Sequence, residues 1–543
     1  MEIQTVKKME SEAIKGSSVD FTRLGAALFF MVAVLTYSFI STGGVPNNIF
    51  LAVAALFGAY MAMNIGANDV ANNVGPAVGS KALTMGGAIV IAAIFEAAGA
   101  LIAGGEVVKT IKKGIIDISA FGANTESFIW AMMAALLAAA VWLNFATMAK
   151  APVSTTHSIV GGVMGAGIAA AGFGIVAWGT MGKIAASWVI SPVLGGIIAA
   201  TFLLAIKKTM VYKENKIQAA TKWVPVFVAI MSWAFVTYLT LKGLKKVWPT
   251  IVDILVFLPE AKKPSFMVAS MFGLVVAVII YVIVKATVAK RAGNLENSRD
   301  GVNMLFTVPL IFAAALLSFA HGANDVANAI GPLAAINDAV MTGGISSKAG
   351  IPLWVMAVGA IGIAIGLALY GPKLIRTVGS EITELDQMRA FSVAMAASIT
   401  VIIASQLGLP VSSTHIAVGG IFGVGFLREY LAETDKIDDI AVGKENIDEE
   451  KKVLKALNAE LKSLELQEDK KKVDYERVVA LYKMIDQEEI NIKEYKKDLK
   501  NAQKVQYVKR DAVKKIIAAW VITVPAAAVL SALIYFMIRG IVL

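Results

Sequence analysis

Long apolar runs, separated by short polar stretches, fill the first 427 residues and return near the C-terminus. Each run holds roughly 20 residues, the length of a helix that crosses the hydrocarbon core of a bilayer. This pattern predicts an all-α polytopic membrane protein. The apolar runs lie at 25–43, 49–66, 82–105, 128–149, 153–172, 176–206, 224–241, 266–288, 303–320, 352–371, 388–408, 411–427 and 513–539.

A highly charged stretch, 428–512, interrupts this pattern before the last run. Its apolar residues recur at helical spacing, as at Leu454, Leu457, Leu461 and Leu464. We therefore expect a small helical soluble insertion of two or three amphipathic helices, packed as a hairpin or a coiled coil. The predicted segments are a polar N-terminus (1–24), a first membrane repeat (25–206), connecting spans (207–302), a second membrane repeat (303–427), the soluble insertion (428–512) and a final transmembrane helix (513–543).

The composition agrees with a membrane protein and narrows its chemistry. Apolar residues make up 57% of the chain, and the absence of cysteine excludes disulfides and thiol chemistry. Residues 428–515 hold 21 basic and 21 acidic groups, so the net charge of +10 belongs to the rest of the chain. There it is typical of loops that orient spans, and we expect no nucleic-acid partner.

One octapeptide occurs twice: GANDVANN at 66–73 and GANDVANA at 322–329, 256 residues later. Each copy ends an apolar run and carries an acid, Asp69 or Asp325. An acid inside a membrane usually faces a cavity, a partner or an ion. A helix cap at the membrane surface is the alternative, but two copies in matching context argue against it. The flanking amides complete a set of hard oxygen ligands that suits Na⁺; they belong to Asn68, Asn72, Asn324 and Asn328.

A second motif follows each copy: Ala151–His157 reads APVSTTH, and Leu409–His415 reads LPVSSTH, 258 residues later. Proline followed by Ser/Thr is a good helix start. Hydroxyls and free N–H groups at the positive end of a helix form a plausible anion site, with ordinary capping of a buried helix as the alternative. The candidate anion ligands are Ser154, Thr155, Thr156, Ser412, Ser413 and Thr414.

Neither motif contains an arginine or a lysine. The nearest basic residues, Lys81 and Lys150, are expected to reach a membrane interface instead. The charge of a bound anion would then be offset by cations bound with it, which is a physical reason for ion coupling. We expect Asp69 and Asp325 to hold those cations.

Further polar residues lie in or beside the motifs. Glu96 is another intramembrane acid, and Gln406 precedes the second PVSSTH motif, so both are candidate Na⁺ ligands. The counterpart of Gln406 in the first half is Met148, so only the second half could supply this ligand. The histidines could switch protonation near neutral pH or serve packing alone; they are His157, His321 and His415.

The repeats also constrain the topology. If 128–172 and 388–427 each form a re-entrant helical hairpin, five crossings separate the two Asp helices, and the halves are inverted repeats. Gly66 and Gly322 permit close helix approach or a helix break at the site. The N-terminus and the insertion then share the more basic, cytoplasmic side, although the basic loop 242–263 argues against this orientation.

The four motif copies resemble those of the inorganic phosphate transporter (PiT) family, which includes animal sodium–phosphate symporters. The match covers about 49–175 and 303–427. The resemblance implies a secondary transporter, without a cofactor, that moves phosphate with Na⁺ or H⁺. It places the hairpin hydroxyls at the phosphate and cation site with Asp69, Asn72, Asp325 and Asn328, and Glu96 matches a motif glutamate of the first half.

The chain departs from the animal members at Met133 and Ala394, where they carry glutamates. The smaller number of titratable groups favours Na⁺ over H⁺. We therefore expect a Na⁺-coupled phosphate importer in the cell membrane, assembled as a homodimer.

Three alternatives remain. The nearest is the same fold coupled to H⁺ or carrying sulfate. An intramembrane hydrolase built on Ser154 and His157, or on their copies, is disfavoured because an enzyme needs one nucleophile constellation. A channel or receptor that signals through the soluble insertion is the third class.

Overall fold

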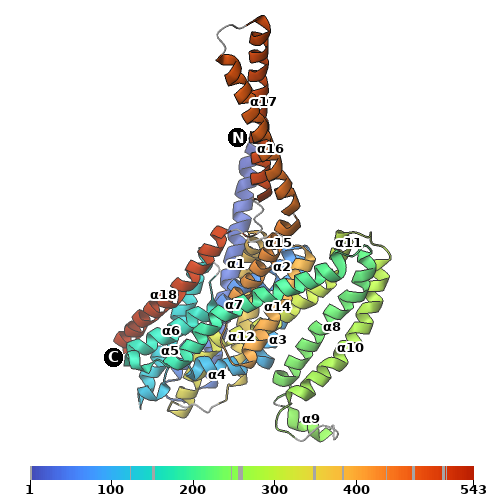
Figure 1. The fold of residues 1–543 in the computed structure, drawn as a ribbon. Coiled ribbons are helices and arrows are strands. Elements are labelled where there is room, and N and C mark those ends of the chain that lie inside the picture. Colours follow the sequence, from blue (N-terminus) through green and yellow to red (C-terminus); the bar gives the residue numbers. More distant parts are fainter. Residues whose placement is uncertain are drawn as a thin grey trace. The chain divides into compact units, whose positions relative to one another are not determined.

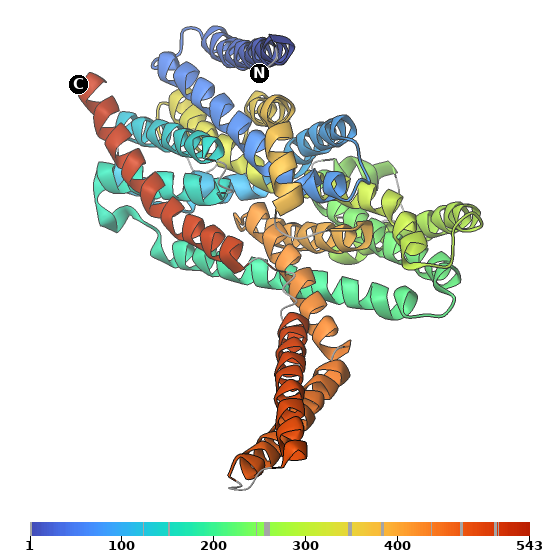
Figure 2. The same ribbon diagram turned by 90° about the horizontal axis from the view of Figure 1, so that it is seen from above.

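The structure is a computed structural model that describes residues 3–122, 124–149, 153–245, 247–254, 261–345, 350–381, 385–435, 437–466, 471–503, 508 and 510–542. Lys150, Ala151 and Pro152 of the first hairpin tip lie outside these residues. The chain divides into a membrane unit, Met1–Val424 with Arg510–Leu543, and an insert unit, Gly425–Lys509. Figures 1 and 2 draw both units as bundles of helices.

The helices of the membrane unit fall into two sets along the chain. The first set is α1 (Ile3–Ser41), α2 (Asn48–Gly79), α3 (Met85–Ala103), α4 (Gly105–Lys113), α5 (Thr125–Met148), α6 (Thr155–Ala171) and α7 (Trp178–Ile206), with short turns η1 (Ile118–Phe121), η2 (Phe173–Ile175) and η3 (Lys207–Val211). The second set is α8 (Lys216–Gly243), α9 (Trp248–Ile254), α10 (Phe266–Ala292), α11 (Arg299–Leu305), α12 (Thr307–Thr342), α13 (Leu353–Glu381), α14 (Gln387–Gln406), α15 (Ser413–Asp435) and α18 (Arg510–Val542).

Eleven helices among the described residues are long and apolar enough to cross a membrane. They correspond to the expected apolar runs, except that 153–172 and 411–427 are not among them. These two runs are α6 and the first part of α15, the second arms of the expected hairpins. The all-helical, multi-pass architecture is therefore confirmed, while the depth to which the hairpins enter the membrane stays a prediction.

The expected spans 49–66 and 303–320 are too short. Helices α2 and α12 continue without a break through both GANDVAN motifs. Gly66 and Gly322 therefore do not break the helices; they allow close helix crossings. A Cβ on Gly66 would lie 2.0 Å from the carbonyl oxygen of Ile363, and one on Gly322 would lie 2.1 Å from that of Glu96. Helix α1 likewise begins at Ile3, within the stretch expected to be a polar N-terminus.

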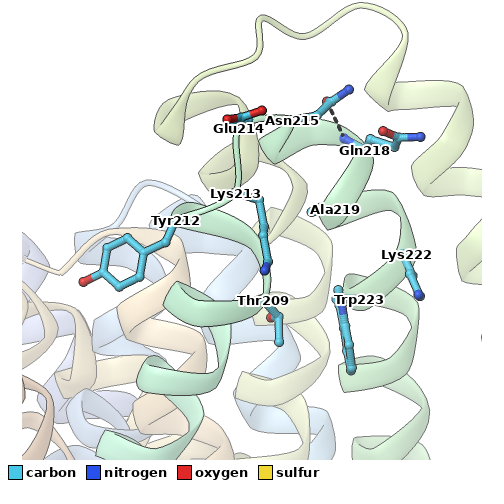
Figure 3. A pocket seen from close by; sticks show the side chains of 9 residues that line it. All are labelled: Thr209, Tyr212, Lys213, Glu214, Asn215, Gln218, Ala219, Lys222 and Trp223. Carbon is cyan, nitrogen blue, oxygen red and sulfur yellow. Dashed lines mark hydrogen bonds between the residues drawn. The ribbon is translucent and has the colours of Figure 1, made fainter.

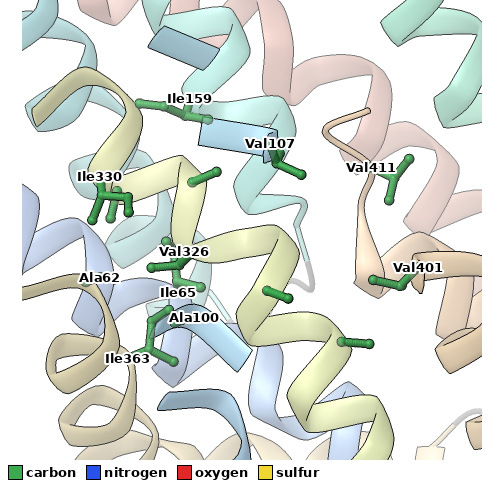
Figure 4. Close-up of a cluster of buried hydrophobic side chains, with 14 of the residues drawn as sticks. Ala62, Ile65, Ala100, Val107, Ile159, Val326, Ile330, Ile363, Val401 and Val411 are labelled. Carbon is green, nitrogen blue, oxygen red and sulfur yellow. The ribbon is translucent and has the colours of Figure 1, made fainter. Parts of the chain in front are cut away.

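The two halves pack on each other by making the same contacts twice. Helix α2 crosses α13, where a Cβ on Gly366 would meet the carbonyl oxygen of Met63 at 2.0 Å. Helix α12 crosses α3 in the equivalent way, since a Cβ on Gly99 would lie 2.0 Å from the carbonyl oxygen of Phe319. Each GANDVAN helix thus packs on a helix of the other half. Figure 4 shows the apolar side chains at these crossings, among them Ile65, Ile363 and Val326.

The helices behind the hairpins also pack on helices of the opposite half. Helix α6 of the first hairpin packs on α18, where a Cβ on Gly161 would meet the carbonyl oxygen of Val524 at 2.6 Å. Helix α15 packs on α7, where a Cβ on Gly419 would lie 2.2 Å from the carbonyl oxygen of Pro192. Both hairpins are therefore held by a helix from the opposite half of the chain.

The turn between α7 and α8 is polar and basic (Figure 3). It borders an open pocket of about 680 Å³ that includes Lys213, Lys222 and Trp223. Two candidate spans end here, and lysine with aromatic residues is typical of a membrane–water interface.

The insert unit contains α16 (Ile437–Glu465) and α17 (Lys472–Gln503). These helices pack through buried Leu457, Leu461 and Leu481, which lie at the apolar positions read from the sequence. An Arg477–Glu460 ion pair of 2.8 Å joins their exposed faces. The insertion is thus a pair of antiparallel helices with a small apolar core of its own.

The close crossing at Gly66 predicts a large effect of one methyl group. Gly66→Ala should destabilise the protein by about 1–3 kcal/mol, because the backbone of α13 has to move away. The measurement is the thermal unfolding midpoint Tm in detergent. Gly75→Ala is the control in the same helix, since a Cβ there meets nothing within 4 Å. Equal Tm values for the two variants would contradict this account of the crossing.

Candidate functional site

Asp69 and Asp325 meet in the centre of the membrane unit, where α2 and α12 face the tips of both hairpins. Their exposed fractions are 1% and 0%. One oxygen of each carboxylate and a ring nitrogen of His321 lie within 4.8 Å of one another. A buried carboxylate destabilises the fold unless hydrogen bonds replace its hydration. The neighbours of the two aspartates therefore determine how both can be buried.

Each aspartate accepts a hydrogen bond from the hairpin of its own half. Thr155 donates to Oδ2 of Asp69 at 2.9 Å, and Ser413 donates to Oδ2 of Asp325 at 2.8 Å. The two hydroxyls occupy equivalent places in the PVSTTH and PVSSTH motifs. The duplicated sequence motifs thus form duplicated contacts.

A second set of hydrogen bonds crosses between the halves. Asn72 donates to the Thr414 hydroxyl at 2.9 Å, and Asn328 donates to the Thr156 hydroxyl at 3.1 Å. Thr414 in turn donates to Oδ1 of Asp69 at 3.0 Å. The site is therefore one structure shared by both halves, as two polar motifs in each half indicate.

The asparagine just before each aspartate binds a hydroxyl that was not among the expected ligands. Asn324 donates to Ser405 at 3.0 Å. Asn68 accepts from Thr147 at 3.1 Å when its amide is oriented to donate to Oδ1 of Asp69, also at 3.1 Å. Thr147 and Ser405 are 258 residues apart, so the offset of the second motif could have identified them.

One side of the site carries a histidine and a third acid. His321 approaches Asp325 at 2.9 Å and Asp69 at 3.5 Å through Nε2, and Glu96 at 3.4 Å through Nδ1. Asn73 donates to the same Glu96 oxygen at 2.8 Å. The counterparts of His321 and Glu96 are Ile65 and Ile363, because Gly66 crosses Ile363 as Gly322 crosses Glu96.

His321 and Asn73 are thus central residues that were not among the expected ligands. A comparison of the two motif copies could not identify them as site residues, because neither has a polar counterpart in the other copy. The expected Na⁺ ligand Gln406 forms no hydrogen bond to either aspartate that the described part of the chain records, and its Nε2 has no partner there. A cation-binding function of Gln406 stays a prediction.

Ser154 and Ser412 cap the helices that follow the hairpin tips. Their hydroxyls accept from the backbone N–H of His157 at 3.1 Å and of His415 at 3.2 Å. The ring nitrogens of both histidines lack a hydrogen-bond partner among the described residues. Neither serine is hydrogen-bonded to a histidine ring among these residues, so the geometry gives the hydrolase alternative no support.

Those two histidines lie against each other between two tryptophans. The ring centroids of His157 and His415 are 4.5 Å apart, and each ring also contacts a tryptophan, Trp188 at 3.8 Å or Trp520 at 3.6 Å. This stack joins the two hairpins behind the site. Its contacts favour a packing role for these histidines over a ligand role.

The cluster holds more acceptors than donors. Buried oxygens without a hydrogen bond in the described part belong to Asn73, Glu96, Asn324, Asp325 and Asn328. Lys81 is exposed, and no lysine or arginine forms an ion pair with these acids among the described residues. Acceptor oxygens in this excess suit a hard cation. The helix starts at Thr155 and Ser413 offer donors to an oxyanion.

A pocket of about 430 Å³ lies beside the site. The polar part of its lining is Tyr60, Asn64, Asn144, Thr147 and Tyr370, from α2, α5 and α13. Thr147 also bonds Asn68, the neighbour of Asp69. The pocket therefore lies one hydrogen-bonded residue away from Asp69.

Comparisons with known proteins identify the family of this chain. Residues 65–531 match the sequence model of the phosphate transporter family. The chain is 50% identical to a candidate phosphate permease of Helicobacter pylori J99 over 98% of both chains. It is 38% identical to a candidate phosphate permease of Pyrococcus abyssi, over 70% of this chain and 89% of that one.

A solved structure, the sodium-dependent phosphate transporter, is also similar. It shares 30% of the aligned residues with a TM-score of 0.70, over 91% of this chain and 99% of that chain. The chain belongs to the phosphate transporter family.

Proposed function

We propose that the protein is a Na⁺-coupled phosphate symporter whose single site is shared by its two halves. The observation that carries this proposal is the excess of buried acceptor oxygens around Asp69 and Asp325, beside hydroxyls at two helix starts. The acids would hold Na⁺, and Thr155, Thr156, Ser413 and Thr414 would hold phosphate.

Electrostatics make the cation necessary. Two like charges about 4 Å apart repel by about 4 kcal/mol at an effective dielectric constant near 20. A phosphate dianion beside Asp69, Asp325 and Glu96 would meet this repulsion several times over. Na⁺ at the carboxylates removes it, so each ion makes the binding of the other favourable. The similar solved structure is a sodium-dependent phosphate transporter, which supports the same choice of cation.

Transport would follow from movement of the two halves about this site. Contacts made twice with the halves exchanged are what inverted repeats around a midplane site would give. The placement of the N-terminus and the insertion in the cytoplasm rests on loop charge and stays a prediction, as does the homodimer.

The first test is uptake of labelled phosphate into proteoliposomes. Uptake should rise at least tenfold when an inward Na⁺ gradient is imposed, because Na⁺ binding favours phosphate binding. Uptake that responds to a proton gradient and ignores Na⁺ would identify the H⁺-coupled alternative. Competition by excess sulfate would show that the site does not select phosphate.

The carboxylates can be tested one at a time. Asp69→Asn and Asp325→Asn should each raise the Na⁺ concentration for half-maximal uptake about tenfold or more, because a formal charge is lost in a low-dielectric site. The exposed acid Glu126 provides the control, as Glu126→Gln should leave the Na⁺ dependence unchanged. Na⁺ dependence equal to that of the natural protein in both aspartate variants would refute their role.

The hairpin hydroxyls should affect phosphate rather than Na⁺. Thr156→Ala and Thr414→Ala should each raise the KM for phosphate about fivefold, the loss of one hydrogen bond worth about 1 kcal/mol. Thr201→Ala is a matched control, because the exposed Thr201 hydroxyl bonds only its own helix at Ile197. An unchanged KM in a hairpin variant would remove that hydroxyl from the phosphate site.

A further inference from the structure

The residues before the two hairpin tips differ in exposure. Asn144 and Thr147, at the end of α5, line the pocket of about 430 Å³. Their counterparts at the end of α14 are Ile402 and Ser405, with exposed fractions of 9% and 2%. The approach along α5, which we call the first route, is therefore accessible at these residues, and the equivalent approach along α14, the second route, is closed.

The short helix α4 closes the second route. Its Thr110 hydroxyl donates to the carbonyl oxygen of Gly408 at 2.7 Å, in the turn that begins the second hairpin tip. Aromatic side chains of α8 add to the closure, since Phe235 and Tyr238 pack edge-on against Phe319 of α12. Helix α4 is thus attached to the segment that presents Ser413 and Thr414.

A buried ion pair fixes α4 to α12. Lys112 and Asp338 bind each other with side-chain exposures of 6% and 5%. A buried pair of this kind adds little net stability compared with an apolar pair, but it sets one register, and loss of one partner is costly. It is a device that holds two elements in one defined position.

The other end of α4 is attached as well. Lys245, which follows α8, donates to Glu106 at 2.8 Å. This hydrogen bond, with Lys109 and Lys242 nearby, lowers the pKa of Glu106 to about 2. The Glu106 carboxylate is therefore ionised near neutral pH.

The first half has no such pair. Gly99 and Gly366 make equivalent crossings, which aligns 107–111 (VVKTI) with 374–378 (LIRTV). At this offset Lys112 corresponds to Gly379 of α13. At the offset of the GANDVAN motifs, Asp338 corresponds to Ala82. The equivalent positions, Gly379 and Ala82, therefore cannot form the ion pair.

We propose that α4 is a latch on one side of the transporter: Lys112, Asp338 and Thr110 hold the second hairpin closed. The latch has to release for the site to open on that side in each transport cycle. This inference rests on the proposed function, because a latch matters only if the site opens alternately to two sides.

Cysteine accessibility tests the latch directly, since the natural chain contains no cysteine. Asn144→Cys and Ile402→Cys are a matched pair at equivalent places beside the two tips. A charged methanethiosulfonate should modify Asn144→Cys at least tenfold faster than Ile402→Cys in the purified full-length protein. Similar rates would mean that the second route is not closed, and the latch would be refuted.

Release of the latch should reverse the protection. The paired change Lys112→Met with Asp338→Leu removes both charges together and leaves no buried ion alone. It should speed modification of Ile402→Cys about tenfold without speeding that of Asn144→Cys. Thr110→Val should act in the same direction, more weakly, and serves if the paired variant does not fold. An unchanged Ile402→Cys rate in a folded variant overturns the proposal.

A locked latch should separate binding from transport. Cysteines at 112 and 338, joined by a short bifunctional methanethiosulfonate, should reduce phosphate uptake to background until the bridge is reduced. Equilibrium binding of labelled phosphate should stay within about twofold, because the first route remains open. Full uptake by the bridged protein would refute the latch. Failure of the unbridged protein to bind phosphate would instead contradict the proposed function.

Discussion

Two carboxylates buried side by side are the constraint on which the rest of this structure depends. Asp69 and Asp325 lose their hydration, so every polar group around them has to compensate. The compensating groups come from both halves: Asp69 is bonded by Thr155 of its own half and by Thr414 of the other. Asp325 is bonded by Ser413 and His321 of its own half, but Asn328 beside it bonds Thr156 of the other, so the site is joined across the two halves.

This requirement explains the small residues of the membrane unit. Two helices that each carry an acid can share one set of ligands only if their neighbours approach to backbone contact. Gly66 and Gly322 allow this at the site, and Gly161 and Gly419 allow it behind the hairpins. Packing between small residues is also how helices associate in a membrane, where the hydrophobic effect does not drive one helix onto another. Fold and site therefore depend on the same positions.

The polar ligands could be predicted because they are duplicated. Repetition in matching context identified the acids, the asparagines and the hairpin hydroxyls, and the structure brings these residues together. His321 was harder to identify as a site residue, because its counterpart is Ile65 and a single histidine is more often a packing residue. The helix ends at Gly79 and Thr342 were missed because polar residues inside an apolar run resemble a terminus. Only tertiary contacts identify them as the lining of a buried site.

The proposed latch could not be predicted from the sequence. It depends on the pairing of Lys112 with Asp338, 226 residues away, and neither residue belongs to a repeated motif. A site with full two-fold symmetry would have no preference for either side, because both routes would have the same free energy. The differences between the halves would supply that preference: an acid and a histidine on one side of the site, and an ion pair beside one hairpin. If both proposals hold, the duplicated residues determine what the site binds, and the residues without a counterpart determine the side to which it opens.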